Sequence, residues 1–477
     1  MHTVEKIGGT SMSDYVSVRD NIILNQNLDG VYRRIFVVSA YGGVTDALLE
    51  HKKSGQPGIY GLFANGIEDD SWLTKCNELH QQLQAINLEL FGQTTLLDKA
   101  NTFLAERMDD AKKCLADLQS LCQHGHFALD AHLATVREML ASIGEAHSAW
   151  NTAELLNRDG VDACFVDLTG WRADHHISLD ERIRLSFQHI NLEKQLPIVT
   201  GYAHSDSGLM SSFDRGYSEM TFSRLAVLTG ASEAIIHKEF HLSSADPRLV
   251  GEENAVPIGR TNYDVADQLA NLGMEAIHPK AAKGLRQNDI PLRIKNTFEP
   301  VHTGTLITGD YVSESPCVEI IAGCKGIYAL EVFDQDMAGN LSNYDSELVS
   351  IIKRFNAHIV SKDTNANAIT HFLSTNLKTV KRILYLIKER FPEADVNHKK
   401  VAIVSAIGSD MQIPGILAKM VQAVANENIS VLAVHQSMRQ VDMQFIVNEA
   451  DHDNTVKSLH AALVEVHDHG RAICLAS

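Results

Sequence analysis

Basic residues are scarce in this sequence of 477 residues. Lysine and arginine total 42, against 60 aspartate and glutamate residues, which gives a formal net charge of -18. A surface with this charge repels nucleic acids and anionic membranes. We therefore expect neither as a partner, and the excess of acidic residues by itself predicts only a well-solvated protein.

Long apolar runs and paired cysteines are also missing. No run of about 18 apolar residues occurs, so no transmembrane helix is predicted. The first residues alternate in polarity, which is not typical of a secretory signal. The seven cysteines are odd in number and include no Cys-x-x-Cys pair, so a reducing compartment fits better than a disulfide framework. These features predict a cytoplasmic protein.

The segment from Lys6 to Ser11, Lys-Ile-Gly-Gly-Thr-Ser, carries the strongest chemical signal. Glycines let backbone N–H groups approach an anion, a helix N-terminus after Thr10 adds a favourable dipole, and lysine adds a point charge. The spacing is not that of a P-loop, G-x-x-x-x-G-K-[ST]. The segment predicts a phosphate site, although by itself it fits a tight strand-to-helix turn equally well.

The rest of the N-terminal region alternates strands and helices. The apolar runs 34–39 and 196–201 are typical of buried parallel strands, at whose carboxyl ends ligand sites lie, and 162–167 is also strand-like. From about 71 to 150 the spacing is helical, which predicts a helical insertion with core positions such as Leu79 and Leu83. The adjacent His175 and His176 point in different directions, so a solvated loop is favoured over a metal site.

From about Cys317 the pattern changes to two units of similar length. The first contains a strand at 326–332, a helix at 346–355 and a strand at 357–360, and the second repeats the order at 400–404, 413–426 and 429–434. This is the βαββαβ pattern of a ferredoxin-like unit. We therefore predict a catalytic domain at 1–310, a first C-terminal unit at 317–397 and a second at 398–477.

Six segments, in order, resemble motifs of the aspartate kinases, members of the amino-acid kinase family. Lys6 to Ser11 resembles K-F-G-G-T-S, and 37–48 resembles V-V-S-A-x-x-G-x-T-[ND]-x-L. Gly144-Glu145 resembles the family's G-E helix start. The other three matches are 211–219 with T-T-x-G-R-G-G-S-D, 244–248 with T-x-D-P-R, and 277–279 with L-H-P. Each match is weak alone, but the series extends over nearly the whole chain.

The resemblance implies an α/β fold: an amino-acid kinase domain, with a parallel-rich central sheet between helices, followed by two ferredoxin-like ACT units. Family members thread one ACT unit into the other, so Val318 to Ile321 is expected to complete the second. The resemblance also implies L-aspartate and ATP as substrates, with Mg²⁺ carried by the ATP phosphates and no metal ligands from the protein. It further implies an amino-acid effector at the ACT units and a homodimer or higher homo-oligomer. The sequence equally allows an ACT pair that serves only dimerisation.

The same resemblance assigns roles to individual residues. Lys6 would stabilise charge on the transferred phosphate, Arg215 would hold the α-carboxylate of aspartate in a bidentate fork, and Glu145 would bind its ammonium group. Further substrate contacts are assigned to Ser39, Thr45, Ser218 and Glu219. ATP contacts are assigned to Gly8, Gly9, Thr10, Ser11, Lys238, Ser243, Asp246 and Arg248. For any single charged residue, the alternative is a surface ion pair.

Several positions depart from the family pattern. The family's T-D-V-x-G segment is His237 to His241 here, the lysine before L-H-P is Glu275, and Tyr217 and Glu219 replace a glycine and an aspartate. Lys238 or Lys280 would restore the lost positive charge. This set resembles the aspartate kinases associated with ectoine synthesis. Two alternatives remain: a related amino-acid kinase with another acidic substrate, and a non-catalytic regulatory protein with ACT units.

A further departure concerns the expected effector site of the first ACT unit. Lysine- or threonine-inhibited relatives carry a hydroxyl-and-acid pair after the second strand of this unit, where it holds the ammonium group of the effector. Here Asn365 stands in the place of the acid, and Lys362 lies three residues before it. An amide cannot form an ion pair with the ammonium group of the effector, and a nearby lysine repels a cationic ligand. The sequence therefore predicts a weak response to lysine.

Overall fold

The computed structural model describes residues 1–24, 30–52, 54–65, 70–124, 126–172, 177–206, 208–213, 216–274 and 276–465. These residues form two compact units. The first contains Met1–His241 and Ile277–Gly309, and the second contains Leu242–Ala276 and the chain from Asp310 onward. Among the described residues, no helix has both the length and the apolar character needed to cross a membrane.

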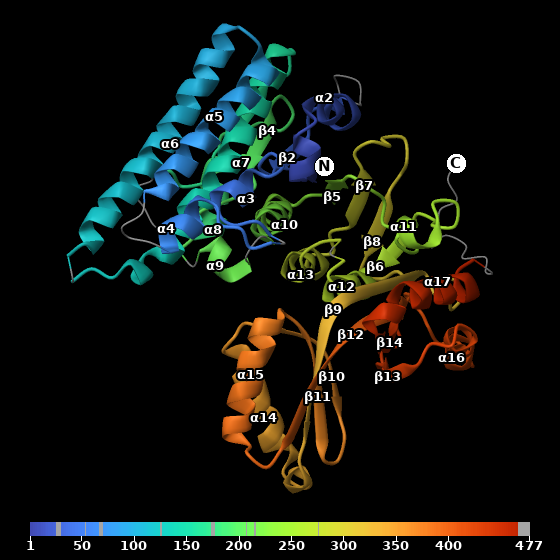
Figure 1. Ribbon diagram of the computed structural model, residues 1–477. Helices are drawn as coiled ribbons and strands as arrows, with labels where there is room; N and C mark the ends of the chain where they lie inside the picture. The colour runs from blue at the N-terminus through green and yellow to red at the C-terminus, as the bar shows by residue number, and fades with distance from the viewer. Residues whose placement is uncertain are drawn as a thin grey trace. The chain divides into compact units, whose positions relative to one another are not determined.

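A mostly parallel sheet forms the centre of the first unit (Figure 1). Its strands lie in the order β3-β4-β2-β1-β5-β7-β8. All neighbours are parallel except β8, which is antiparallel to β7. The bounds are β1 Thr3–Ile7, β2 Arg34–Val38, β3 Ala163–Val166, β4 Leu196–Thr200, β5 Glu233–Lys238, β7 Leu292–Asn296 and β8 Thr305–Thr308. Every residue of β2 and β4 is buried, as expected for central strands of a doubly covered sheet.

Three long helices form a layer beside this sheet, α5 Ser71–Phe91, α6 Thr95–Cys122 and α7 Leu133–Arg158 (Figure 1). Leu79 and Leu83 are fully buried, as their spacing predicted. α7 packs on β3 and β4, and α10 packs on β1. The other helical segments of this unit are α1 Gly9–Met12, α2 Tyr15–Ser17, η1 Val18–Ile23, α3 Val44–Leu48, α4 Ile59–Asn65, η3 Leu129–Ala131, α8 Leu179–Phe187, α9 Leu209–Phe213, α10 Tyr217–Thr229 and α13 Pro279–Gln287.

The second unit contains a six-stranded antiparallel sheet in the order β10-β11-β9-β12-β14-β13. Its strands are β9 Ile320–Phe333, β10 His358–Thr364, β11 Ala368–Ser374, β12 Asp395–Ile407, β13 Val431–Gln436 and β14 Asp442–Asn448. The helices are α14 Leu341–Lys353, α15 Leu377–Arg390, α16 Ile416–Asn426 and α17 His452–Leu463. Shorter segments are α11 Pro247–Val250, β6 Arg260–Asn262, α12 Tyr263–Asn271, η5 Gln335–Met337 and η6 Glu449–Asp451.

Two ferredoxin-like halves share the long strands β9 and β12. The first half of β9 pairs with the end of β12, so that Ile320 lies opposite Ile407, and the second half of β9 pairs with both β11 and β12. Each half has its own apolar core, one around α14 and α15 and the other around α16 and α17. The predicted fold class, a parallel-rich kinase sheet followed by two ferredoxin-like units, is therefore confirmed.

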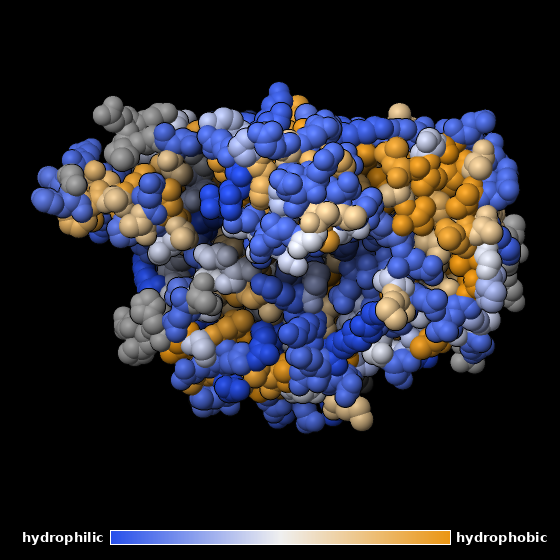
Figure 2. Space-filling model, turned by 90° about the horizontal axis from the view of Figure 1, so that it is seen from below, coloured by the Kyte–Doolittle hydropathy of each residue, from blue (hydrophilic) through white to orange (hydrophobic). Residues whose placement is uncertain are grey.

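Apolar side chains gather on the surface of the second unit around α16 and β13 (Figure 2). Leu417 and Val421 of α16 and Leu432 and Val434 of β13 each expose more than a third of their surface, from 38% for Val434 to 43% for Leu417 and Leu432. Because β13 is the last strand of its sheet, the patch lies beside an open strand edge.

Candidate functional site

Lys6 and the residues after it form a tight turn at the carboxyl end of β1. Gly8 leaves the strand in an extended conformation, and α1 begins at Gly9. A Cβ atom at Gly9 would lie 2.6 Å from the carbonyl oxygen of Ala40, so only glycine fits there. At Gly8 the nearest atom would be 3.5 Å away, so packing does not require glycine at that position. Thr10 is exposed and Ser11 is buried.

The donors of Ser11 already have a partner. Both its backbone N–H and its hydroxyl donate to Oε1 of Glu239, at 3.0 and 2.9 Å, and the hydroxyl also lies 3.1 Å from that of Thr297. A carboxylate thus takes the donors that the sequence assigned to a phosphate. Glu239 belongs to the 237–241 segment that departs from the family pattern, and sequence reasoning gave it no role.

Glu145 lies on α7 and is almost completely buried, with 1% of its surface exposed. Its Oε1 accepts a hydrogen bond of 2.6 Å from the hydroxyl of Ser218 at the start of α10. Gly201 makes room for this carboxylate, and Gly144 lets α7 pack closely on the segment after β2. A Cβ atom at Gly201 would lie 2.9 Å from Oε2 of Glu145, and one at Gly144 would lie 2.8 Å from the Cβ atom of Ala40.

Lys6 lies close to this carboxylate and to a second one. Its ammonium group is 3.9 Å from Oε1 of Glu219, and both side chains are largely buried. Glu219 also accepts a short hydrogen bond from the backbone N–H of His278. The structure therefore brings four predicted site residues together, Lys6, Glu145, Ser218 and Glu219, although they come from three different elements.

Burial dominates the electrostatics of Glu145 and raises the pKa of its carboxyl group to about 8. The Ser218 hydroxyl, the Lys6 ammonium group and the nearby backbone amides of Tyr202 and Ala40 act in the opposite direction, but more weakly. Oε2 has no hydrogen-bond partner among the described residues. The site therefore contains a carboxyl group that is mostly protonated at neutral pH and has one buried oxygen without a hydrogen-bond partner in the described part of the chain.

Ser39 and Thr45 lie next to the turn after β1. Ser39 directly follows β2, and its backbone N–H donates to the carbonyl of Ile7 at 3.2 Å. Thr45 belongs to the short helix α3, and both side chains are half-buried. The carboxyl ends of β1 and β2 thus hold the predicted phosphate and carboxylate contacts side by side.

Glu138 is a further buried carboxylate on α7, two turns before Glu145. It accepts hydrogen bonds from the hydroxyl of Tyr202 at 2.7 Å and from the backbone N–H groups of Met210 and Ser211 at 3.1 and 2.9 Å. It therefore fixes the start of α9, which leads toward Ser218. Sequence reasoning missed Glu138 because it lies in a helical stretch, and its partners are more than 60 positions away.

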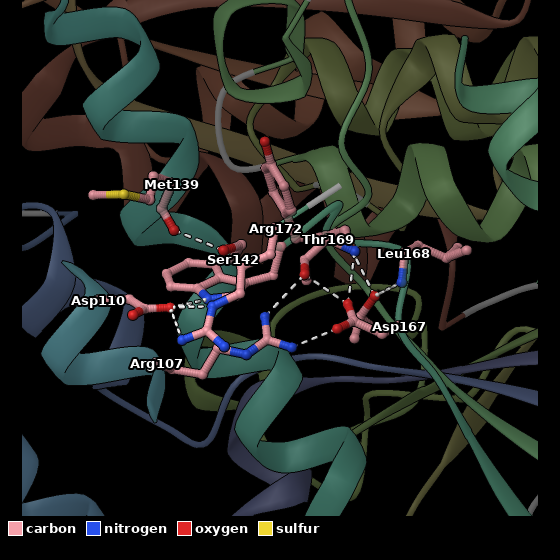
Figure 3. A network of polar contacts seen from close by, with 11 residues as sticks. Arg107, Asp110, Met139, Ser142, Asp167, Leu168, Thr169 and Arg172 are labelled. Carbon is pink, nitrogen blue, oxygen red and sulfur yellow. Dashed lines mark hydrogen bonds and ion pairs between the residues drawn. The ribbon is translucent and has the colours of Figure 1, made fainter. Parts of the chain in front are cut away.

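A polar network links α6 to the segment after β3 (Figure 3). Arg107 of α6 donates to the hydroxyl of Thr169 at 3.0 Å and forms an ion pair with Asp167. One turn further along α6, Asp110 accepts a hydrogen bond of 2.7 Å from Arg172. These contacts attach the long helix to the carboxyl edge of the sheet, where the candidate site lies.

The remaining predicted residues lie at the end of β5, belong to the second unit or are not described. Ser243, Asp246 and Arg248 belong to the second unit, where Asp246 caps α11 and pairs with the exposed Arg248. Lys238 ends β5 in the first unit. Arg215, Glu275, His175 and His176 lie outside the described residues.

The altered segment 237–241, at the end of β5, makes contacts of its own. His237 donates a hydrogen bond of 2.8 Å to the buried carboxylate of Glu5, and His241 packs against His302 at 4.2 Å between ring centres. Lys280, which the sequence suggested as a replacement cation, lies over the ring of Phe213 at 4.7 Å. Among the described residues, no group of three or more histidine, cysteine or acidic side chains is arranged to hold a metal ion.

Two parts of the chain match known protein families. Residues 1–296 match the amino acid kinase family, and residues 404–463 match an ACT domain. The first match covers the sheet, the turn after β1 and the helix that carries Glu145. The second covers the end of β12 through α17.

Relatives of known name agree with these matches. The chain is 53% identical to the protein named aspartate kinase Ask_Ect of Stutzerimonas stutzeri strain A1501, over 100% of both chains. It is 23% identical to chloroplastic aspartokinase 1 of Arabidopsis thaliana, over 98% of this chain and 80% of the relative. Among solved structures, E. coli aspartokinase III in complex with aspartate and ADP matches with a TM-score of 0.72 and 20% identity, over 97% of this chain and 100% of that one. The chain therefore belongs to the amino acid kinase family, among its aspartate kinases.

Proposed function

We propose that this protein transfers the γ-phosphate of ATP to the β-carboxylate of L-aspartate and releases 4-phospho-L-aspartate. The observation that carries the proposal is the buried Glu145, with one free carboxylate oxygen, close to Lys6 and to the glycine turn. As the family resemblance implies, the product would supply the synthesis of aspartate-derived amino acids or of ectoine. We place the reaction in the cytoplasm, since the six described cysteines are all free.

The chemistry requires little beyond positioning and charge. A β-carboxylate is already ionised at neutral pH, so its attack on phosphorus requires no general base. The main obstacle is repulsion between two anions, which cations and backbone N–H groups reduce. We assign Lys6 to the transferred phosphate, and Gly8, Gly9 and Thr10 to the phosphate oxygens. Mg²⁺ would arrive with ATP, bound by its phosphates.

We assign recognition of aspartate to groups of opposite charge. Glu145 would pair with the ammonium group, with Ser218 orienting the carboxylate, and Ser39 and Thr45 would donate to carboxylate oxygens. The sequence assigns the α-carboxylate to Arg215. Ser11 would exchange Glu239 for a phosphate oxygen when ATP binds. We assign Lys238, Ser243, Asp246 and Arg248 to ATP on the family resemblance alone.

A coupled assay tests this function. ADP release is followed with L-aspartate as acceptor, and hydroxylamine traps the acyl phosphate as the aspartyl hydroxamate. Hydroxamate formation only with aspartate supports the proposal. Formation only with another acidic amino acid would favour a related kinase, and no ADP release with any acceptor would favour a non-catalytic regulatory protein.

The protonation of Glu145 predicts a pH dependence. Only the ionised carboxylate pairs with the substrate ammonium group, and in the empty site its pKa is raised to about 8. Below this value we expect kcat/KM for aspartate to rise about tenfold per pH unit and then to level off. Saturating aspartate should flatten the profile of kcat, because the bound ammonium lowers the pKa of Glu145. A flat profile of kcat/KM between pH 6 and about 8 would contradict this role.

We also propose that lysine is a poor effector of this protein. Lys362 of β10 forms an ion pair with Asp345 of α14, with 2.8 Å between Nζ and Oδ2, and Asn365 replaces the acid. An effector acts only through a difference in its affinity for two states, so a site that binds weakly in both cannot inhibit. At subsaturating aspartate, we expect millimolar lysine to change activity by less than about twofold. Strong inhibition by lysine alone would refute this.

We extend the proposal to a homo-oligomer formed through the second unit. Leu432 and Val434 expose apolar surface on the edge strand β13, beside Leu417 and Val421 of α16. Open strand edges and apolar patches of this kind pair readily with another chain. Sedimentation velocity at micromolar protein tests this, and a single monomeric species would count against it.

A further inference from the structure

One face of the sheet in the first unit carries ionic side chains. The register places Glu5 beside Ile235, and Ile235 beside Arg293. Because side chains alternate along a strand, Arg34, Glu233, His237 and Lys295 point to the same face as Glu5. The opposite face carries Val4, Ile35, Ala234 and Leu292. Parallel sheets are normally apolar on both faces, and departures from such local rules are concentrated at functional sites.

Most of these ionic groups have partners. Glu5 accepts hydrogen bonds of 2.6 and 2.9 Å from Arg34 and lies 2.8 Å from His237. Although burial alone would raise the pKa of Glu5, Arg34 and His237 outweigh it and hold that pKa well below its usual range. Arg293 pairs with Glu233 at 2.8 Å. Both carboxylates of this face, those of Glu5 and Glu233, therefore have partners.

Lys295 is the exception. Among the described residues it forms neither a hydrogen bond nor an ion pair, although the charges of Glu5, Glu233, Arg34 and Arg293 act on it. Burial, together with the two guanidinium groups, lowers the pKa of Lys295. A half-buried ammonium group without a partner is costly, and an anion would remove that cost.

A cavity of about 520 Å³ opens on this face, where Thr3, Arg34 and Glu233 begin their strands. Its charged lining consists of Arg33, Arg34, Arg293 and Lys295 with Glu5 and Glu233, so four cationic side chains face two carboxylates. Arg33 lies at the rim, where it pairs with the exposed Glu193. The cavity therefore has an excess of positive charge in a protein whose net charge is -18.

We propose that this cavity binds a small oxyanion, a carboxylate or phosphate group, with Lys295 as its main contact and Arg293 beside it. The site is separate from the candidate active site. Most of the lining lies where β1, β2 and β5 begin, at Thr3, Arg34 and Glu233, whereas Ser39 and Lys238 lie at the other ends of these strands. Lys6 is in register with Ile236 and Ile294, so it points to the face opposite that of Lys295. The proposal therefore does not depend on the proposed kinase activity.

Titration of three proteins with inorganic phosphate and with succinate tests the proposal. Isothermal calorimetry and thermal unfolding are measured at constant ionic strength, with chloride as the control, for the wild type, Lys295→Met and Lys6→Met. A ligand that binds only the folded state raises Tm in proportion to the logarithm of its concentration. We expect binding in the wild type and in Lys6→Met, and at least about tenfold weaker binding in Lys295→Met.

The variants separate the two possible anion sites. A response lost only in Lys6→Met would place the anion at the turn after β1 and overturn the proposal, as would an equal response in all three proteins. Tighter binding of phosphate than of succinate, or the reverse, identifies the class of ligand. Lys295→Met should keep wild-type turnover in the hydroxylamine assay.

If Lys295→Met does not fold, a second measurement on the wild type tests the proposal. Lysines of the wild type are reductively methylated with a ¹³C label, and the Lys295 resonance is identified by its absence from Lys295→Arg. We expect this resonance to shift on addition of phosphate or succinate at constant ionic strength, and its pKa to rise. An unchanged Lys295 resonance would overturn the proposal.

Discussion

Lys6→Ala is expected to slow phosphoryl transfer by about 10²–10³-fold. Lys6 is a largely buried cation at the end of β1, placed between two carboxylates and the glycine turn. A charge partner that is fixed before the reaction requires no reorganisation as charge develops on the phosphoryl group, so its removal acts mainly on the transition state. The effect should therefore appear in kcat with both substrates saturating.

The fold should survive this change. The ion pair from Lys6 to Glu219 is long, at 3.9 Å, and Glu219 keeps its hydrogen bond from His278. Lys295→Ala provides a matched control, since it removes a half-buried lysine from β7, two strands away from β1 in the same sheet and outside the candidate active site. Near-normal turnover in a folded Lys6→Ala protein would refute the assignment, as would an equal loss in Lys295→Ala.

Glu145→Gln should lower kcat/KM for aspartate by about 100-fold and leave the KM for ATP within about twofold. Glutamine keeps the size of the side chain and can still accept a hydrogen bond from Ser218. It loses the negative charge that we assign to the substrate ammonium group. The loss should appear mainly in the KM for aspartate, and the pH dependence of kcat/KM near 8 should disappear with it.

Stability gives an independent check on the same variant. The pKa of Glu145 is raised in the folded protein, so its contribution to stability is fully present below the ordinary value near 4.5 and is lost as pH rises through about 8. Glutamine does not titrate, so Glu145→Gln should gain stability relative to the wild type as pH rises from 6 to 9. A Tm difference that is independent of pH would show that the carboxyl group is not buried as described.

Local sequence patterns predicted the helices and strands well, because the pattern of apolar residues in a segment reflects which of its faces is buried. The runs at 34–39 and 196–201 form β2 and β4, and the repeated strand-helix pattern forms the two ferredoxin-like halves. The motif resemblance also selected Lys6, Glu145 and Ser218, which lie together. A segment with strong hydrophobic periodicity can be recognised as a helix or strand without knowing which segments it packs against.

Contacts between distant segments could not be predicted in this way. Glu138 holds Met210 and Ser211, and Glu239 holds Ser11 across 228 positions, yet neither glutamate differs in its local sequence from a surface residue. Such contacts depend on how α7 packs on the sheet and on the register between β1 and β5. The pattern of a single sequence shows neither the packing of α7 nor the register of these strands.

The three glycines around Glu145 and the turn after β1 have a consequence for protein engineering. At positions 9 and 201 any side chain would meet a backbone carbonyl, that of Ala40 at 2.6 Å or of Val38 at 2.8 Å, and at position 144 it would meet Ala40 and Val44. Backbone atoms cannot move aside as the end of a side chain can. A library designed to change the acceptor from aspartate to a longer acid should therefore keep these three positions fixed and vary the side chains of Ser39, Thr45 and Ser218 instead.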